Sequence, residues 1–178
     1  MNAHKREWAN GRANRAKISR AAALVLALAM AVLAPALAGC GGEGDAEITL
    51  DMRGLAKTLI GGVAFEDQME EATADAFRAL YALDSSDESV KDFVLYASTG
   101  ATAEEVTVIE ARDAASAPDV MERVRARIAS QKTEFENYAP AEMAKLDDPV
   151  LVSHGKYIVL CLSNDNAAAE AIIEDFIE

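Results

Sequence analysis

Residues 150–173, "VLVSHGKYIVLCLSNDNAAAEAII", hold two apolar runs that are separated by a short polar turn and followed by an alanine-rich segment. The turn contains His154 and Gly155, and a glycine between two apolar runs is typical of a β-hairpin. We therefore predict antiparallel strands over 150–153 and 156–163. Apolar residues then recur at helical spacing, which predicts an amphipathic helix over 166–178. The stretch is a strand–strand–helix unit.

A second unit of the same kind lies upstream. "VKDFVLYAS" (90–98) and "EEVTVIEA" (104–111) have the composition of strands, and the intervening "TGAT" is typical of a hairpin turn. A long helix is predicted from about Pro118 to Tyr138, with one buried stripe along it. That stripe comprises Val120, Val124, Ile128, Phe135 and Tyr138. The two units share a pattern of strand, Asx turn, alanine-rich start and helix, a weak signal of internal duplication.

Shorter helices precede these units. "LDMRGLAKTLIGG" (50–62) places Asp51 as a helix N-cap and Gly61 as a stop, and "AFRALYAL" (76–83) indicates a second short helix. The predicted fold class is α+β. It consists of a four-stranded, mainly antiparallel sheet made of two strand–strand–helix units, with helices packed on one face and N-terminal helices before it. One such domain is expected over 48–178.

The first 39 residues differ in charge from the rest. They carry six basic residues and one acid, which gives a net charge of +5. The whole chain has a net charge of −13, so residues 40–178 carry −18. A basic head followed by the uncharged run 21–38 is typical of a secretory signal. A retained transmembrane anchor is the rival interpretation, but half of this run is alanine and Pro35 interrupts it. The acidic body repels phosphate backbones, so nucleic acid is not an expected partner.

The segment Leu37-Ala38-Gly39-Cys40 resembles the lipobox of bacterial lipoproteins. That resemblance implies cleavage between Gly39 and Cys40 and attachment of a diacylglyceryl group to the Cys40 thiol. Residues 1–39 would then be a removed signal peptide, and 40–47 a lipidated cysteine and flexible tether. The expected location is the extracytoplasmic side of the cell membrane, with the membrane as a partner through the anchor. A plain signal peptide cut nearby, with Cys40 incidental, is the competing interpretation.

Three stretches carry a resemblance to a known family: "FVLYASTGATAEEVTVIEARD" (93–113), "SQKTEFENYAP" (130–140) and "VLVSHGKYIVLCLSNDNAAAEAII" (150–173). The chain resembles an uncharacterised bacterial lipoprotein family, the domain of unknown function four-three-five-eight, over roughly 48–178. The resemblance implies a cell-envelope lipoprotein with a small α+β domain. It implies no activity.

Few residues of the body point to chemistry. His154 is the one histidine after the signal, too few for a histidine metal site, and no cofactor or metal is expected. Cys161 lies in an apolar run and is predicted to be a buried core thiol. The acidic stretches lack the pattern of a calcium loop. Arg123 and Arg127 share a helix face and could bind an anion or a partner, although pairing with neighbouring acids explains them more simply.

Tyr96 and Tyr157, on predicted strands, are the remaining candidate binding residues, with ordinary sheet packing as the simpler explanation. No catalytic residue is assigned, and the sequence leans against an enzyme without deciding the question. The expected function is a non-catalytic binding or interaction module on the envelope, with an envelope protein as a candidate partner. A small accessory solute- or substrate-binding lipoprotein is the alternative. A hydrolase of envelope polymers, using carboxylates near Glu104 and Glu105, is the third hypothesis.

Overall fold

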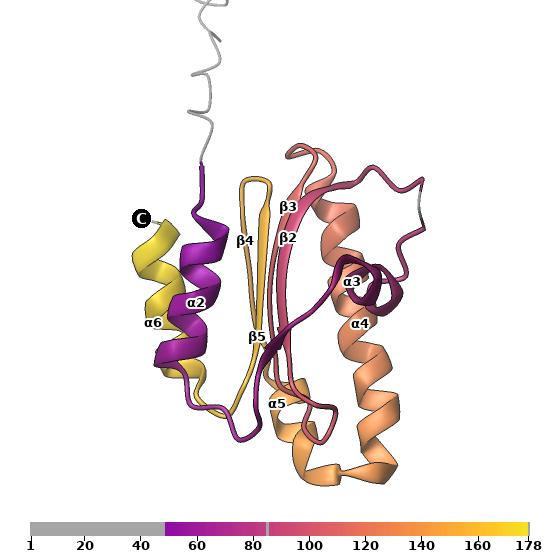
Figure 1. Ribbon diagram of the computed structural model, residues 1–178, viewed down its shortest axis with the longest axis vertical. Helices are drawn as coiled ribbons and strands as arrows, with labels where there is room; N and C mark the ends of the chain where they lie inside the picture. Colours follow the sequence, from indigo (N-terminus) through magenta and orange to yellow (C-terminus); the bar gives the residue numbers. More distant parts are fainter. Residues whose placement is uncertain (1–48, 85, 178) are drawn as a thin grey trace, which may run out of the picture. The chain divides into compact units, whose positions relative to one another are not determined.

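A computed structural model describes residues 49–84 and 86–177, and the predictions for 1–48 lie outside these ranges. The described residues form a mixed α+β fold around a five-stranded antiparallel sheet with strand order β1-β2-β3-β5-β4 (Figure 1). The strands are β1 Glu70–Glu71, β2 Val90–Ala97, β3 Glu105–Ala111, β4 Val150–His154 and β5 Tyr157–Leu162. The helices are α2 Met52–Gly62, α3 Ala74–Leu80, α4 Ala117–Tyr138, the 3-10 turn η2 Pro140–Glu142, α5 Met143–Asp147 and α6 Asn166–Ile177.

Both predicted strand–strand–helix units are present as β2–β3–α4 and β4–β5–α6. Local signals account for their boundaries. Asp51 caps α2 by accepting a hydrogen bond from the Gly54 backbone N–H at 2.9 Å. Gly100 in the β2–β3 loop has φ +93° and Gly155 in the β4–β5 turn has φ +57°, conformations that a side chain disfavours.

The predicted count of four strands is wrong. The fifth strand, β1, has only two residues, and it pairs Glu70 with Ala97 and Glu71 with Tyr96 at the edge of β2. Both residues of β1 are exposed glutamates. Glutamate is depleted in strands, and two residues show no alternation, so no strand pattern is visible in this acidic stretch.

The prediction that helices cover one face is also wrong, because helices cover both. In Figure 1, α2 and α6 lie on one side of the sheet and α3 and α4 on the other. Along β5, Val159 and Cys161 pack in the α2–α6 layer, whereas Ile158 and Leu160 pack in the α4 layer. Since all six residues of β5 are buried, each face of the central strands needs a helical cover.

The α4 stripe is nearly as predicted, with one error. Val120, Val124, Ile128 and Phe135 are buried, but Tyr138 is 74% exposed because it ends the helix. Cys161 is fully buried, as predicted. Among the residues that the structure describes, no helix has both the length and the apolar character to cross a bilayer.

The sheet has two ends, which we call the entry end and the hairpin end. At the entry end, Thr49 lies in a pocket with Lys91 and Glu110, which belong to the start of β2 and the end of β3. At the hairpin end, β2 and β3 are joined by the loop 98–104 (Figure 1). The seven residues of β3 separate the two ends by about 20 Å.

Candidate functional site

A pocket at the hairpin end, here named the α4 pocket, lies between the β2–β3 loop and the second half of α4. Its volume is about 320 Å³, in the lower range for small-molecule sites. The loop contributes Ser98, Thr99 and Thr102, which carry hydroxyl groups. The helix contributes Arg127, Gln131, Glu134 and Phe135, and Leu80 of α3 completes an apolar wall.

Beneath this pocket lies a buried polar cluster, here named the Glu105 network, which contains Tyr81, Glu105, Thr107 and Arg127. Glu105 is fully buried, and its Oε2 accepts hydrogen bonds from Arg127 Nε at 3.1 Å and Nη2 at 3.0 Å. The Tyr81 hydroxyl lies 2.5 Å from Glu105 Oε1 and 2.9 Å from Thr107 Oγ1. Every partner of the carboxylate is thus charged or polar, which compensates its removal from water.

The pKa of Tyr81 reflects this environment. Burial, followed by the negative charge of Glu105, raises the pKa of Tyr81 well above its ordinary value. The phenol therefore stays protonated and acts as a donor to the carboxylate. Its chemistry fits a structural support for Glu105 and Arg127 better than a proton-transfer group working near neutral pH.

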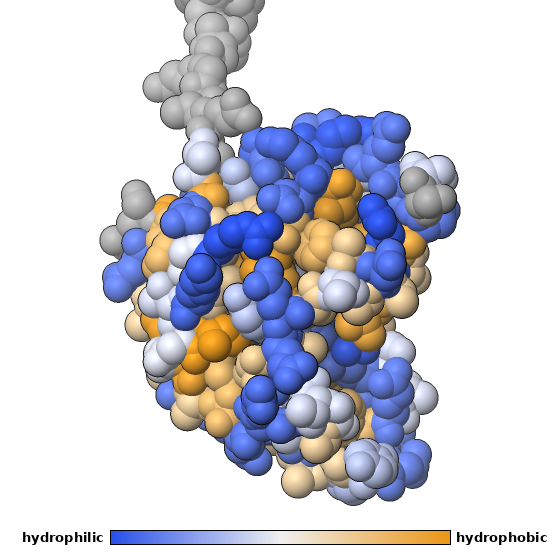
Figure 2. All heavy atoms as spheres, viewed as in Figure 1, coloured by the Kyte–Doolittle hydropathy of each residue, from blue (hydrophilic) through white to orange (hydrophobic). Residues whose placement is uncertain are grey.

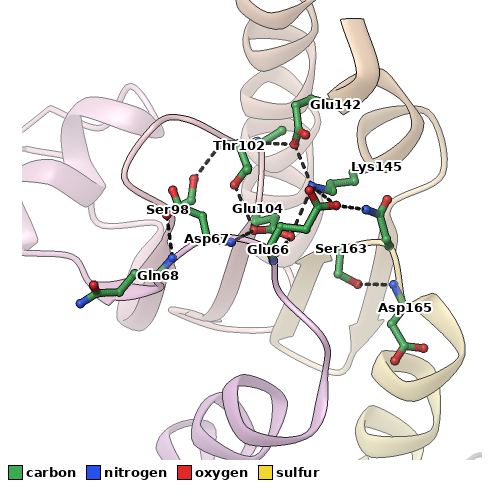
Figure 3. Close-up of polar contacts among 12 residues, drawn as sticks. Glu66, Asp67, Gln68, Ser98, Thr102, Glu104, Glu142, Lys145, Ser163 and Asp165 are labelled. Carbon is green, nitrogen blue, oxygen red and sulfur yellow. Dashed lines mark hydrogen bonds and ion pairs between the residues drawn. The ribbon is translucent and has the colours of Figure 1, made fainter. Parts of the chain in front are cut away.

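A second polar cluster, the Lys145 network, lies at the same end and contains the buried Glu104, Glu142 and Lys145 and the exposed Glu66 (Figure 3). Lys145 Nζ lies 2.9 Å from Glu142 Oε2 and 3.3 Å from both Glu104 Oε1 and Glu66 Oε1. Glu104 also accepts backbone N–H bonds from Glu66 at 2.9 Å and Asp67 at 3.0 Å. One ammonium group therefore joins the α2–β1 connection, the start of β3 and the α5 region.

The charge state of Lys145 follows from two opposing effects. Burial lowers the pKa of Lys145, but the hydrogen bond to Glu142 and the charge of Glu104 outweigh it, and the net pKa lies above the ordinary value. The amine is therefore protonated and committed to carboxylates. A nucleophilic or basic lysine would need the opposite shift.

Glu104 and Glu105, the carboxylates of the hydrolase hypothesis, extend to opposite sides of the chain. Glu104 contacts Lys145 and the backbone after α2, whereas Glu105 contacts Arg127 and Tyr81 on the α4 side. Each is paired with its own cation. They do not form a pair of acids that face one another across a single cleft, the arrangement that glycoside hydrolysis needs.

The four candidate binding residues from the sequence do not meet in one place. Arg127 lines the α4 pocket, with 10% of its side chain exposed. Arg123, one turn earlier on α4, donates to Ala82 O at 3.1 Å and to the Asp87 carboxylate, and so stabilises the α3–β2 connection. Both arginines are therefore paired with acids or backbone from other elements.

The two tyrosines lie on the opposite face of the sheet. Tyr96 of β2 donates to Glu71 Oε2 at 3.2 Å, and burial, followed by the charge of Glu71, raises its pKa. Tyr157 is buried in the α2–α6 layer and lines the pocket at the entry end, with Lys156 Nζ 5.7 Å from its ring centroid. In that pocket Glu110 is held by Lys91 at 2.8 Å and Lys156 at 3.0 Å.

Sequence reasoning missed Gln131 and Lys145. Gln131 is 3% exposed and falls between Ile128 and Phe135 at the spacing of the buried stripe. An amide at that position was the available signal, because a polar side chain on a buried face needs a local reason. Lys145 gave no comparable signal, because its carboxylate partners come from three separate segments. Cys40 and Gly39 lie outside the described ranges.

In the ranges 49–84 and 86–177, no group of three or more His, Cys, Asp or Glu side chains is placed to hold a metal ion. In the view of Figure 2, hydrophilic residues lie across the top and down the centre of the surface, and apolar residues lie between them, over α2 and around α3. The α4 pocket combines buried polar groups, apolar walls and a cavity.

Comparison with known proteins gives one match. Residues 63–163 match the model of a family described as Domain of unknown function (DUF4358). The match covers more than half of the chain and runs from the end of α2 to the residue after β5. All residues that line the α4 pocket lie within it. No curated protein and no solved structure matches the chain.

Proposed function

We propose, from the premise that this chain belongs to the family described as Domain of unknown function (DUF4358), that it is a non-catalytic binding module of the bacterial cell envelope. A diacylglyceryl group on Cys40 would hold it on the extracytoplasmic face of the membrane. The α4 pocket would be its binding site. The observation that carries this proposal is the location of that pocket at the end of the sheet opposite to Thr49.

The position of the pocket suits a protein anchored through its N-terminal region. Eight residues connect Cys40 to Thr49, and the nine steps between these two residues reach at most about 30 Å. The entry end would therefore lie close to the bilayer. The hairpin end, about 20 Å further along β3, would be the end farther from the point of attachment. A ligand or partner in the envelope could reach the α4 pocket without competing with the membrane.

The two cysteines differ in a way that supports modification of Cys40. The chain has only Cys40 and Cys161. Cys161 is fully buried, and burial raises the pKa of its thiol to about 11. A thiol in that state is a poor nucleophile, so Cys40 is the chemically available site. The small residues Ala38 and Gly39 precede it, as in a lipobox.

The pocket also favours one of the alternatives, a small solute-binding accessory lipoprotein, because a cavity of about 320 Å³ suits a small molecule. This alternative shares the anchor and the site and differs only in the size of the cargo. The hydrolase hypothesis has less support, since Glu104 and Glu105 are directed to opposite sides and each is paired with a cation.

The anchor is tested by replacing each cysteine in turn in the expressing cell. Cys40→Ser should leave the precursor uncut and abolish labelling by a radioactive fatty acid. Cys161→Ala, the matched control, should be processed and labelled like the natural chain. Mass spectrometry of the N-terminal peptide then identifies the lipid. If Cys40→Ser were equally processed and equally retained in the membrane fraction, the lipid-anchor proposal would be wrong.

The binding site is tested separately with a photo-crosslinking amino acid placed in the chain in living cells. Glu134 is exposed and lines the α4 pocket, whereas Lys57 is exposed on α2. Adducts identified by mass spectrometry should form from the Glu134 position and not from the Lys57 position. Equal adduct yields from both positions, or none from Glu134, would show that the α4 pocket is not the binding site.

A further inference from the structure

The chemistry of the α4 pocket limits what it can bind, and Gln131 is the first constraint. Its Nε2 donates to Ala103 O at 3.4 Å, while its Oε1 is buried and makes no hydrogen bond to any residue that the structure describes. A buried amide oxygen without a donor is costly, and in native proteins it calls for an explanation. A ligand of this pocket should therefore bring a hydrogen-bond donor to Gln131.

Arg127 is the second constraint, because the protein fixes its orientation from below. Nε and Nη2 donate to the same oxygen of Glu105, which is itself bonded to Tyr81 and Thr107. Nη1 has no hydrogen-bond partner among the residues in 49–84 and 86–177. A guanidinium held in one plane loses little freedom on binding, which is the advantage of a preorganised site. The ligand should offer an acceptor to Arg127.

The balance of charge is the third constraint. The cation of Arg127 is already neutralised by Glu105, and Glu104 is paired with Lys145. Glu134, which accepts a hydrogen bond from Ser130 at 3.1 Å, stands at the pocket without a basic partner in the described ranges. An anionic ligand would thus meet the unpaired carboxylate of Glu134 and a guanidinium already paired with Glu105, and a cationic ligand would have to lie against the Nη1 side of that guanidinium. The pocket favours a neutral ligand.

The remaining walls combine hydroxyl groups with apolar surface. Ser98, Thr99 and Thr102 lie on one side, and Leu80 and Phe135 on the other. A molecule that suits both sides has many hydroxyl groups around its edge and C–H groups on its faces. Each hydroxyl can donate to Gln131 Oε1 and accept from Arg127 at the same time.

We propose that the α4 pocket binds a neutral saccharide through Gln131 and Arg127. This inference rests on the proposed function, since it names the ligand class of the same pocket. Gln131 Oε1 is closed to bulk water, so it would reach the saccharide through a turn of the amide towards the cavity, in which the bond from Nε2 to Ala103 O is exchanged for bonds to the ligand. Side-chain adjustments of this kind are common on binding. The Glu105 network keeps Arg127 in place, and a volume of about 320 Å³ suits one sugar ring with its substituents.

The test is a titration of the full chain, extracted from membranes in a detergent that contains no sugar. Neutral monosaccharides, including glucose and N-acetylglucosamine, are compared with glucuronate and glucosamine, which have the same ring but a negative or a positive charge. Calorimetry or ligand-detected NMR should show binding of at least one neutral sugar, with its charged counterparts roughly tenfold weaker. Absence of binding by every neutral sugar, or preference for a charged one, would overturn the proposal.

Gln131→Met tests the atom that carries the inference, because methionine keeps the volume and removes the amide. Affinity for the neutral sugar should fall roughly tenfold. Stability should change little, since the variant loses an unpaired buried oxygen together with the 3.4 Å bond from Nε2 to Ala103 O. Glu136→Gln, a change on the exposed side of α4, should leave affinity unchanged and is the matched control.

If Gln131→Met binds the sugar as well as the natural chain does, the site is elsewhere and the proposal is wrong. The outcomes also separate the two proposals. A chain that carries lipid on Cys40 and crosslinks from Glu134, but binds no neutral sugar, retains the proposed function and loses only the ligand class. A chain that binds sugar but carries no lipid retains the ligand and loses the anchor.

Discussion

Arg127 and Glu105 form an ion pair between the middle of α4 and the first residue of β3, with two nitrogens bonded to one carboxylate oxygen. Only 10% of the Arg127 side chain and none of the Glu105 side chain is exposed. The pair fastens the helix to the sheet and sets the direction of the guanidinium in the α4 pocket. The stability of the fold and the binding that we propose for this pocket would therefore depend on the same contact.

Removing Arg127 should be strongly destabilising. Arg127→Leu leaves Glu105 buried without its cation, and we expect the free energy of unfolding to fall by about 3–5 kcal/mol. Arg125→Leu is the matched control, because Arg125 is exposed and pairs with Glu122, and it should cost less than about 1 kcal/mol. Urea unfolding followed by circular dichroism measures both. A cost for Arg127→Leu no larger than that of Arg125→Leu would contradict this account of the pair.

Replacing both members of the pair should restore much of the loss. With Glu105→Leu added to Arg127→Leu, no buried charge is left unpaired, and well-packed apolar side chains can replace such a pair at little cost. The double variant should thus be more stable than Arg127→Leu alone in the same urea experiment. If the double variant lost as much stability as Arg127→Leu and Glu105→Leu lose together, the ion pair between these residues would not be the source of the destabilisation.

Lys145 should matter in the same way for the other buried cluster. Lys145→Met leaves Glu104 and Glu142 without their shared cation, and a loss of about 3–5 kcal/mol is expected. Lys132→Met makes the same substitution at a more exposed lysine, which pairs with Asp147. It should lower the free energy of unfolding by about 0–1 kcal/mol. Thermal and urea unfolding of both variants provides the comparison, and similar costs would show that the burial of Lys145 is unimportant.

The buried thiol predicts a loss of stability in alkali. Burial raises the pKa of Cys161 from an ordinary 9.0 to about 11 in the folded chain. Because the folded pKa is the higher one, this contribution is complete below pH 9 and is lost as the pH rises to 11. The difference of two pKa units corresponds to about 3 kcal/mol.

Cys161→Ala isolates that contribution. The variant should be less stable than the natural chain at pH 8, because a buried side chain is truncated. Its free energy of unfolding should then decline less steeply between pH 9 and pH 11. The pKa values of Tyr81 and Lys145 are raised as well. Their contributions are the same in the natural chain and in Cys161→Ala, so they cancel in the comparison. If the free energy of unfolding declined equally in both chains between pH 9 and pH 11, the thiol would not titrate as expected.

Gly100 is required for its backbone conformation. Nothing lies within 4 Å of a Cβ atom added there, but φ is +93°. Gly100→Ala should therefore cost about 1–2 kcal/mol through conformation alone. Gly61→Ala is the matched control, since Gly61 is in a helix with free space around it, and that change should stabilise by about 0.5–1 kcal/mol. The two shifts in melting temperature should have opposite signs.

Much of the fold could be predicted because its signals are local. The α2 cap at Asp51, the glycines of the two hairpin turns and the helical spacing of α4 each act within a few residues. The position of the helices on the sheet could not be predicted in this way. The continuous apolar run of β5 does indicate a central, covered strand, but the placement of α2 and α6 on one face and of α3 and α4 on the other is decided by tertiary packing.

The α4 pocket was only partly predictable. Arg127 could be proposed as a binding residue from its helix face, and it does line the pocket. Gln131 was visible only as a polar residue on a buried stripe. The carboxylate that orients Arg127 lies on a strand 22 residues before it in the chain. Its pairing is decided by tertiary packing, which spacing along the sequence does not encode.

The strand order has a consequence for the way the chain acquires its structure. The β2–β3 and β4–β5 hairpins each pair neighbouring segments, but the central contact of the sheet pairs Glu105 with Leu162. Contacts so distant along the chain carry a large loop-closure entropy and slow the folding of a domain. During synthesis, β3 therefore keeps one edge unpaired until β5 has emerged. A chaperone that shields this edge would act in the interval before β5 arrives.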